Sequence, residues 1–133
     1  MTFYLFQDIY PFAGKIRNVQ LMKGETRFCQ AQYIESNLND LFRKLNREPV
    51  WETRDQAKKQ LAFYKSELNM IHPFRGGTGR VSRLIIREAA RNHRYNWDFG
   101  RIDSALYTKT MIRSVIDVSS LQSLFHQTLT TCH

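Results

Sequence analysis

Residues 72–83 read His-Pro-Phe-Arg-Gly-Gly-Thr-Gly-Arg-Val-Ser-Arg, which predicts a helix end, a glycine-rich turn and the start of a second helix. Pro73 disfavours the helical conformation for the residue before it, so His72 is expected at a helix terminus. Gly77 and Gly79 allow backbone conformations that are closed to residues with a Cβ atom. A helix that begins after this turn would point its free N–H groups at it. The stretch therefore predicts an anion-binding turn beside a histidine.

The side chains around the turn suit phosphoryl or nucleotidyl chemistry. Arg80 and Arg83 carry forked guanidinium groups that match phosphate oxygens, and His72 can act as base or acid near neutral pH. Two familiar phosphate loops are excluded, because the chain has no Gly-Lys-Ser or Gly-Lys-Thr triplet and no strand is expected before the glycines. Thr78 and Ser82 lie near the histidine, but no carboxylate is placed to orient it, so a serine nucleophile is not expected.

The stretch resembles the motif of the Fic family, His-Pro-Phe-x-(Asp/Glu)-Gly-Asn-(Gly/Lys)-Arg-x-x-Arg. The matching positions are His72, Pro73, Phe74, Gly77, Gly79, Arg80 and Arg83. Residues 6–17 are similar to the family segment Phe-x-Asp-Ile-Tyr-x-Trp-Ala-Gly-x-x-Arg, and residues 23–28 to its Lys-Gly-x-Thr-x-Phe flap. Residues 96–98 and the helical tail resemble the C-terminal part of its core. The chain is therefore identified as a member of this family, and the resemblance covers most of its length.

The resemblance implies a mainly α fold, with a Fic-type helical core and one β-hairpin flap. It implies transfer of AMP from ATP to a hydroxyl group of a target protein, with His72 as the general base. The phosphate-binding residues would be Gly77, Thr78, Gly79, Arg80 and Arg83. The flap would pair its edge with the main chain of the target, and it maps to Met22, Lys23, Gly24, Glu25 and Thr26.

Two positions depart from the family motif. Gly76 stands where the family has the acid that binds Mg²⁺, so this chain lacks the expected metal ligand. Thr78 stands where the family has asparagine, so an amide donor is lost. A weakened adenylyltransferase is the leading hypothesis. The alternatives are a catalytically inactive Fic-fold binding module and an enzyme that transfers a different phosphate-containing group.

Family members are often restrained by a helix with the pattern Ser/Thr-x-x-x-Glu-Gly/Asn, whose glutamate pairs with the second motif arginine. The chain contains no such pattern, and no glutamate follows Glu88. The resemblance therefore implies one of two situations: an antitoxin-like protein supplies the glutamate to Arg83 in trans, or a weak site needs no restraint.

Composition agrees with a single domain over residues 1–133. The hydrophobic content is 42% and the formal net charge is +8, which favours a nucleotide or an acidic protein as partner. Nucleic acid is an unlikely partner, because no recognised binding module is present. No apolar run reaches the roughly 18 residues that span a bilayer. The N-terminus is a poor signal peptide, and two distant cysteines do not indicate a disulfide framework, so a cytoplasmic location is expected.

Apolar periodicity predicts mainly helices. We expect a helix end at 3–10, a turn at Pro11 and Gly14, a hairpin at 16–28, and helices at 31–46, 53–71 (capped by Thr53), 80–93, from Asp103 or Ser104 to Val115, and 119–129. Five arginines form one predicted stripe on the helix after the motif: Arg80, Arg83, Arg87, Arg91 and Arg94. This stripe is a solvated face or a docking face for an acidic helix. Trp51 and Trp97 are expected to pack in the core, and His93, His126 and His133 are too scattered for a metal site.

Overall fold

The computed structural model describes residues 19–20, 22–23, 26–72 and 78–131. The expected helix end at 3–10, the turn at Pro11 and Gly14, the motif positions Gly76 and Gly77, and the flap positions Gly24 and Glu25 lie outside the described residues. Among the described helices, none combines the length and the apolar character that crossing a lipid bilayer requires.

The described chain is mainly helical, as the sequence predicted. Its elements are β1 (Met22–Lys23), β2 (Thr26–Arg27), the short 3₁₀ helix η1 (Ala31–Tyr33), α2 (Ile34–Arg47), α3 (Arg54–Ile71), α4 (Thr78–Asn92), β3 (Tyr95–Trp97), the 3₁₀ helix η2 (Phe99–Arg101), α5 (Ser104–Arg113), α6 (Ser119–Thr128) and β4 (Leu129–Thr131).

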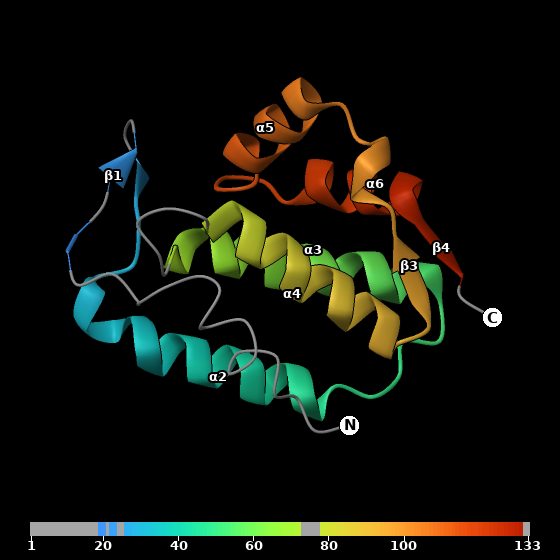
Figure 1. The fold of residues 1–133 in the computed structure, drawn as a ribbon, viewed down its shortest axis with the longest axis horizontal. Helices are drawn as coiled ribbons and strands as arrows, with labels where there is room; N and C mark the ends of the chain where they lie inside the picture. Colours follow the sequence, from blue (N-terminus) through green and yellow to red (C-terminus); the bar gives the residue numbers. More distant parts are fainter. Residues whose placement is uncertain (1–18, 21, 24–25, 73–77, 132–133) are drawn as a thin grey trace.

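Helix α3 lies at the centre of the molecule, with α2 on one side and α5 and α6 on the other, while α4 packs along it (Figure 1). Helices α2, α3, α4 and α6 each bury apolar side chains against their neighbours. The resulting core contains large apolar side chains from α2, α3, α4 and α6, among them Leu38, Leu61, Ile86 and Phe125. The end of α3 and the start of α4 lie at the same end of the molecule as the β1–β2 hairpin (Figure 1).

The start of α3 is fixed by a capping box, which confirms the predicted cap at Thr53. The Thr53 hydroxyl accepts a hydrogen bond from the backbone N–H of Gln56 (3.1 Å), and the Gln56 side chain accepts one from the backbone N–H of Thr53 (3.4 Å). Two otherwise unsatisfied donors of the first turn are paired in this way. The cap sets the direction of the helix that ends at the motif.

A second two-stranded sheet was not predicted. Strand β3 pairs antiparallel with β4, with Trp97 opposite Leu129. The expected helix at 119–129 therefore ends at Thr128, one residue early, because Leu129 begins a strand. The Trp97 indole donates to the Thr128 hydroxyl (3.0 Å), at the end of the sheet where β3 finishes and β4 begins.

The predicted helix at 80–93 is α4, which begins at Thr78 and ends at Asn92. Arg94 has a φ of 68°, so it lies in the left-handed region that commonly follows a helix end. The predicted arginine stripe is therefore wrong at Arg94, which lies beyond the end of α4. The rest of the predicted pattern holds, because Val81, Ile85 and Ala89 are buried while Arg87 and Arg91 are exposed.

Trp51 and Trp97 are buried packing residues, as expected. Trp51 stacks on His93 with ring centroids 3.7 Å apart, and its backbone N–H donates to His93 Nδ1 (3.1 Å). Burial lowers the pKa of His93, an effect that the Glu48 carboxylate partly opposes. His93 is therefore a structural residue of the core.

Candidate functional site

His72 lies at the C-terminal cap of α3, where the sequence predicted a helix terminus. Its backbone is left-handed (φ 44°, ψ 64°), and its N–H donates to the carbonyl of Leu68 (2.9 Å). A left-handed conformation is costly for a residue with a side chain and is found disproportionately at functional sites. Pro73 explains why α3 does not continue through His72, since proline disfavours a right-handed helical residue before it; left-handed residues commonly end helices. His72 therefore ends α3, six residues before the first residue of α4.

The imidazole of His72 is held by an aromatic residue just after the hairpin. Phe28 stacks on it with ring centroids 4.2 Å apart and planes 15° from parallel. Phe28 is itself buried, and the next residue, Cys29, donates its backbone N–H to the carbonyl of Met70 (2.9 Å). The exit of the hairpin is thus tied to the end of α3. The contact between Phe28 and His72 was not predicted from the sequence, because the two residues are far apart in the chain.

The start of α4 at Thr78 offers backbone N–H groups for anion binding, because the first N–H groups of a helix have no partner within it. Arg83 folds back over this first turn: a Cβ atom added to Gly79 would lie 3.3 Å from Arg83 Nη1. A side chain at position 79 would therefore require the Arg83 guanidinium to shift slightly. Of the two predicted phosphate-binding arginines, Arg80 is exposed and Arg83 is half-buried.

Two aromatic rings hold the Arg83 guanidinium. Its Cζ lies 4.6 Å from the centre of the Phe99 ring and 5.9 Å from that of Tyr107. Burial raises the pKa of Tyr107, and a hydrogen bond with Arg83 partly offsets this effect. Cation–π contacts of this kind orient a guanidinium without neutralising its charge. Neither ring was predicted from the sequence, because both come from elements well beyond the motif, η2 and α5.

A buried lysine lies beside the same turn of α4. Lys65 of α3 is 2% exposed, and its Nζ donates to the hydroxyl of Ser82 (2.7 Å), which in turn donates to the carbonyl of Gly79 (3.0 Å). Burial, and to a smaller extent the Arg83 guanidinium, lower the pKa of Lys65 to about 7. One signal in the sequence could have revealed it: Lys65 follows the buried Leu61 by four residues, a position on the apolar face.

The described residues do not fit a magnesium ion. Among them, no group of three or more histidine, cysteine, aspartate or glutamate side chains is arranged to hold a metal. Gly76, at the position of the expected acid, has no side-chain oxygen to offer. A hard cation such as Mg²⁺ needs oxygen ligands, so we assign it no step in the chemistry of this chain.

Several predicted site residues are only partly described. The backbones of Lys23 and Thr26 lie in β1 and β2, which pair antiparallel, while the side chain of Met22 is exposed. Thr78 is the first residue of α4. Gly77, Gly24 and Glu25 lie outside the described residues. The described residues confirm paired hairpin strands at 22–23 and 26–27, while residues 16–18 and 21 of the predicted range of 16–28 lie outside the described residues.

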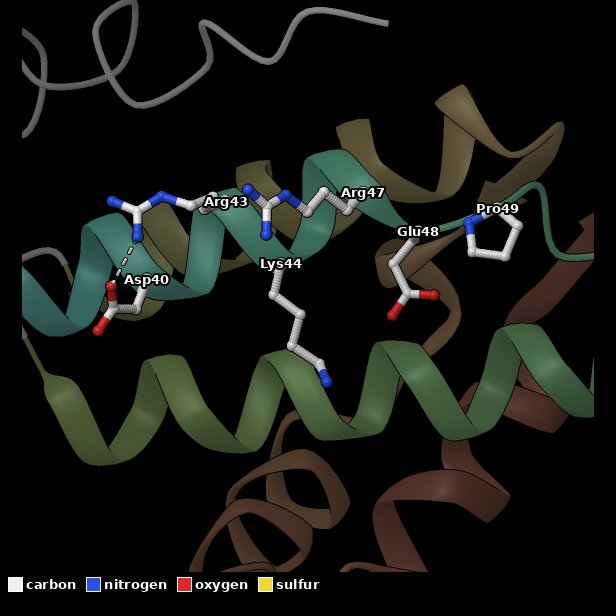
Figure 2. Close-up of a pocket in the computed structure, with 6 residues that line it drawn as sticks. All are labelled: Asp40, Arg43, Lys44, Arg47, Glu48 and Pro49. Atoms are coloured by element: carbon white, nitrogen blue, oxygen red, sulfur yellow. Dashed lines mark hydrogen bonds and ion pairs between the residues drawn. The ribbon is translucent and has the colours of Figure 1, made fainter.

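A separate pocket lies on α2, lined by Asp40, Arg43, Lys44, Arg47, Glu48 and Pro49 (Figure 2). Its basic side chains do not converge. Arg43 pairs with Asp40 at 3.2 Å, and Lys44 reaches towards α3, where its Nζ lies over the Phe63 ring. No motif residue lines this pocket, so the candidate site remains at the junction of α3 and α4.

Comparison with known proteins agrees with this geometry. The profile of the Fic/DOC family matches residues 2–90, which include the hairpin, His72 and most of α4. The chain belongs to the Fic/DOC family. The predicted family resemblance is thereby confirmed, and the mainly α fold is the one expected of it.

Curated Fic relatives share about a third of their residues with this chain. A probable protein adenylyltransferase Fic of Escherichia coli is 32% identical over 124 residues, which are 91% of this chain and 62% of that protein. Protein adenylyltransferase VbhT of Bartonella schoenbuchensis is 35% identical over 121 residues, which are 90% of this chain and 25% of that protein. The chain thus spans less than two thirds of the length of these two relatives.

Solved structures show the same fold. The BepC protein of Bartonella tribocorum, crystallised with bound AMPPNP, superposes with a TM-score of 0.81 and 19% identity, over 93% of this chain and 68% of that one. The N-terminal Fic domain of a putative cell filamentation protein of Bartonella quintana, with bound ADP, gives a TM-score of 0.82 and 20% identity, over 92% and 66%.

Proposed function

We propose that this chain is a Fic-type adenylyltransferase, which moves AMP from ATP to a hydroxyl side chain of a target protein. The observation that carries the proposal is the position of His72, fixed at the end of α3 and stacked on Phe28, six residues before Thr78, the first residue of α4. Relatives that are 32% and 35% identical bear the name of protein adenylyltransferase, which supports the same reaction here.

In the proposed reaction, His72 accepts the proton of the target hydroxyl as its oxygen attacks the α-phosphorus of ATP. A bond forms between that oxygen and the α-phosphorus, the bond from the α-phosphorus to the bridging oxygen breaks, and pyrophosphate leaves. The N–H groups at the start of α4, Arg80 and Arg83 hold the phosphates. The hairpin around Met22, Lys23 and Thr26 offers an edge for pairing with the target main chain.

The departures at Gly76 and Thr78 imply slow transfer. A missing metal ligand and a missing anion-hole donor each remove stabilisation of the transition state, and a donor of this kind is worth about 10²–10³ in rate. Slow self-modification of the isolated chain is the expected outcome. We also propose that an inhibitor restrains the site in trans by supplying a glutamate to Arg83, whose side chain is half-buried.

The test is intact-mass analysis of the purified chain incubated with ATP, beside a His72→Ala control. We expect a slow gain of one AMP unit that the control lacks. The double variant Gly76→Glu/Thr78→Asn should gain this mass faster, by about 10²-fold or more. A gain that persists in His72→Ala would contradict the role of the histidine. If neither the natural chain nor the restored variant gains mass, the inactive binding module or a different phosphate donor replaces the proposal.

A further inference from the structure

Lys65 is a buried basic side chain that the proposed reaction leaves unexplained. Its side chain is 2% exposed, and among the described residues no carboxylate forms an ion pair with it. An ammonium group moved from water to a protein interior is costly unless it is paired or neutralised. The single hydrogen bond to the Ser82 hydroxyl (2.7 Å) satisfies one of its three donors, but it brings no negative charge.

The neighbours of Lys65 increase this cost. Its Nζ lies 5.3 Å from the centre of the Tyr107 ring, and the Arg83 guanidinium lies 5.9 Å from the same centre. Two cations therefore flank one tyrosine of α5. Arg83 on α4 is the charged group that shifts the pKa of Lys65, and the described parts of α2 and α6 add none. This arrangement concentrates positive charge around one aromatic ring, without a described acid to balance it.

This positive charge lies beside the N-terminal turn of α4. The Ser82 hydroxyl connects Lys65 Nζ to the carbonyl of Gly79 (3.0 Å), and Arg83 Nη1 approaches the Cα side of Gly79. The positive end of the helix dipole acts at the same place. Lys65, Arg83 and the helix terminus thus act with the same sign on one small region, and a bound anion would balance all three.

We propose that Lys65 is a buried cation that strengthens polyphosphate binding at the start of α4, in place of charge that a metal ion would otherwise supply. The inference rests on the proposed function, because it concerns the phosphate groups of the same donor. Lys65 is a positioning residue: it acts through Ser82 and through its electric field, and it is too enclosed to contact the reacting atoms.

Protonation and anion binding must then be coupled. If an anion binds more tightly when Lys65 is charged, the bound anion must raise the proton affinity of Lys65 by the same factor. Because the pKa of Lys65 is about 7 in the folded chain without ligand, anion binding near neutral pH should take up protons from solution. The groups that share this environment are Arg83, which stays charged, and Tyr107, whose pKa is raised, so neither is expected to contribute to the uptake.

The test uses isothermal titration calorimetry of the whole chain with pyrophosphate and with ATP, in EDTA and in two buffers of different ionisation enthalpy. We expect the natural chain to bind both ligands and to take up about half a proton at about pH 7.5, if the coupling is about tenfold. Lys65→Met should weaken binding about three- to tenfold at lower pH and lose the uptake. The difference in proton uptake between the natural chain and Lys65→Met excludes contributions from His72 and from the ligands themselves.

A matched control is Lys59→Met, which removes the same charge from an exposed position of α3 that is paired with Asp55. It should bind and take up protons like the natural chain. Cooperative thermal unfolding checks that each variant folds. If Lys65→Met does not fold, lysine side-chain NMR of the natural chain replaces it, and the pKa of Lys65 should rise when pyrophosphate is added.

The outcomes separate the two proposals. Binding of ATP without proton uptake that depends on Lys65, or an unchanged Lys65 pKa in the NMR titration, overturns the inference alone. Binding that occurs only when Mg²⁺ replaces EDTA overturns the inference that Lys65 takes the place of the metal ion's charge. If the natural chain binds neither ligand under any of these conditions, the proposed function and the inference both fall.

Discussion

Lys65 also makes the stability of the fold depend on pH, in the direction opposite to an ordinary surface lysine. Its pKa is about 7 in the folded chain, against an ordinary value of 10.5. Between these two values the unfolded chain binds more protons than the folded chain, so the free energy of unfolding should rise with pH. Allowing for relaxation, we expect Lys65 to add roughly 1 to 3 kcal/mol between about pH 6 and pH 9.

Denaturant unfolding at a series of pH values, without ligand, measures this effect. The same series on Lys65→Met gives the contribution of all other groups, and the difference between the two curves belongs to Lys65. Parallel curves would show that the ammonium is hydrated in the folded protein, which would also weaken the case for its role in anion binding.

At the scale of an element, the direction of α3 depends on its N-terminal cap. Thr53→Ala removes the hydroxyl that pairs with the N–H of Gln56, and we expect a loss of about 1 kcal/mol in the free energy of unfolding. Thr108→Ala is the matched control, because the exposed Thr108 hydroxyl donates to the carbonyl of Ser104 within α5 and caps no helix. Urea unfolding of both variants checks the prediction; equal effects would mean that the capping box contributes little.

At the scale of the whole molecule, β4 ties the end of the described chain to β3 and to the start of α3. Leu129 is 1% exposed in the core, pairs with Trp97 across the sheet, and its carbonyl accepts from Arg54 Nη2 (2.8 Å). Leu129→Ala should therefore lower the free energy of unfolding by about 2–5 kcal/mol.

Thr130→Ala is the control on the same strand. Thr130 faces solvent, so its replacement should change stability by no more than about 0.5 kcal/mol. Thermal unfolding of the two variants compares a buried residue of β4 with its exposed neighbour on the same strand. A mild effect of Leu129→Ala would show that β4 is not part of the cooperative unit.

Features that depend on local interactions were predicted from the sequence, and features that depend on contacts between distant residues were not. The five helices were predicted because their apolar periodicity and caps are local: Thr53, for example, is recognised from the residues that follow it. The second sheet was missed because Trp97 and Leu129 are far apart in the chain, and neither three-residue strand has a strong pattern of its own. Arg94 was placed on α4 because periodicity does not indicate where a helix gives way to a left-handed residue.

By itself, the sequence determined the family, the helical class, the position of His72 at a helix end and the loss of an acid at Gly76. These follow from residue identity and from spacing within a few turns of helix. Only the tertiary structure decided what surrounds the site: Phe28 stacked on His72, Phe99 and Tyr107 against Arg83, and Lys65 buried against Ser82. The physical reason is that burial and electrostatic coupling depend on which distant segments pack together, and local spacing does not carry that information.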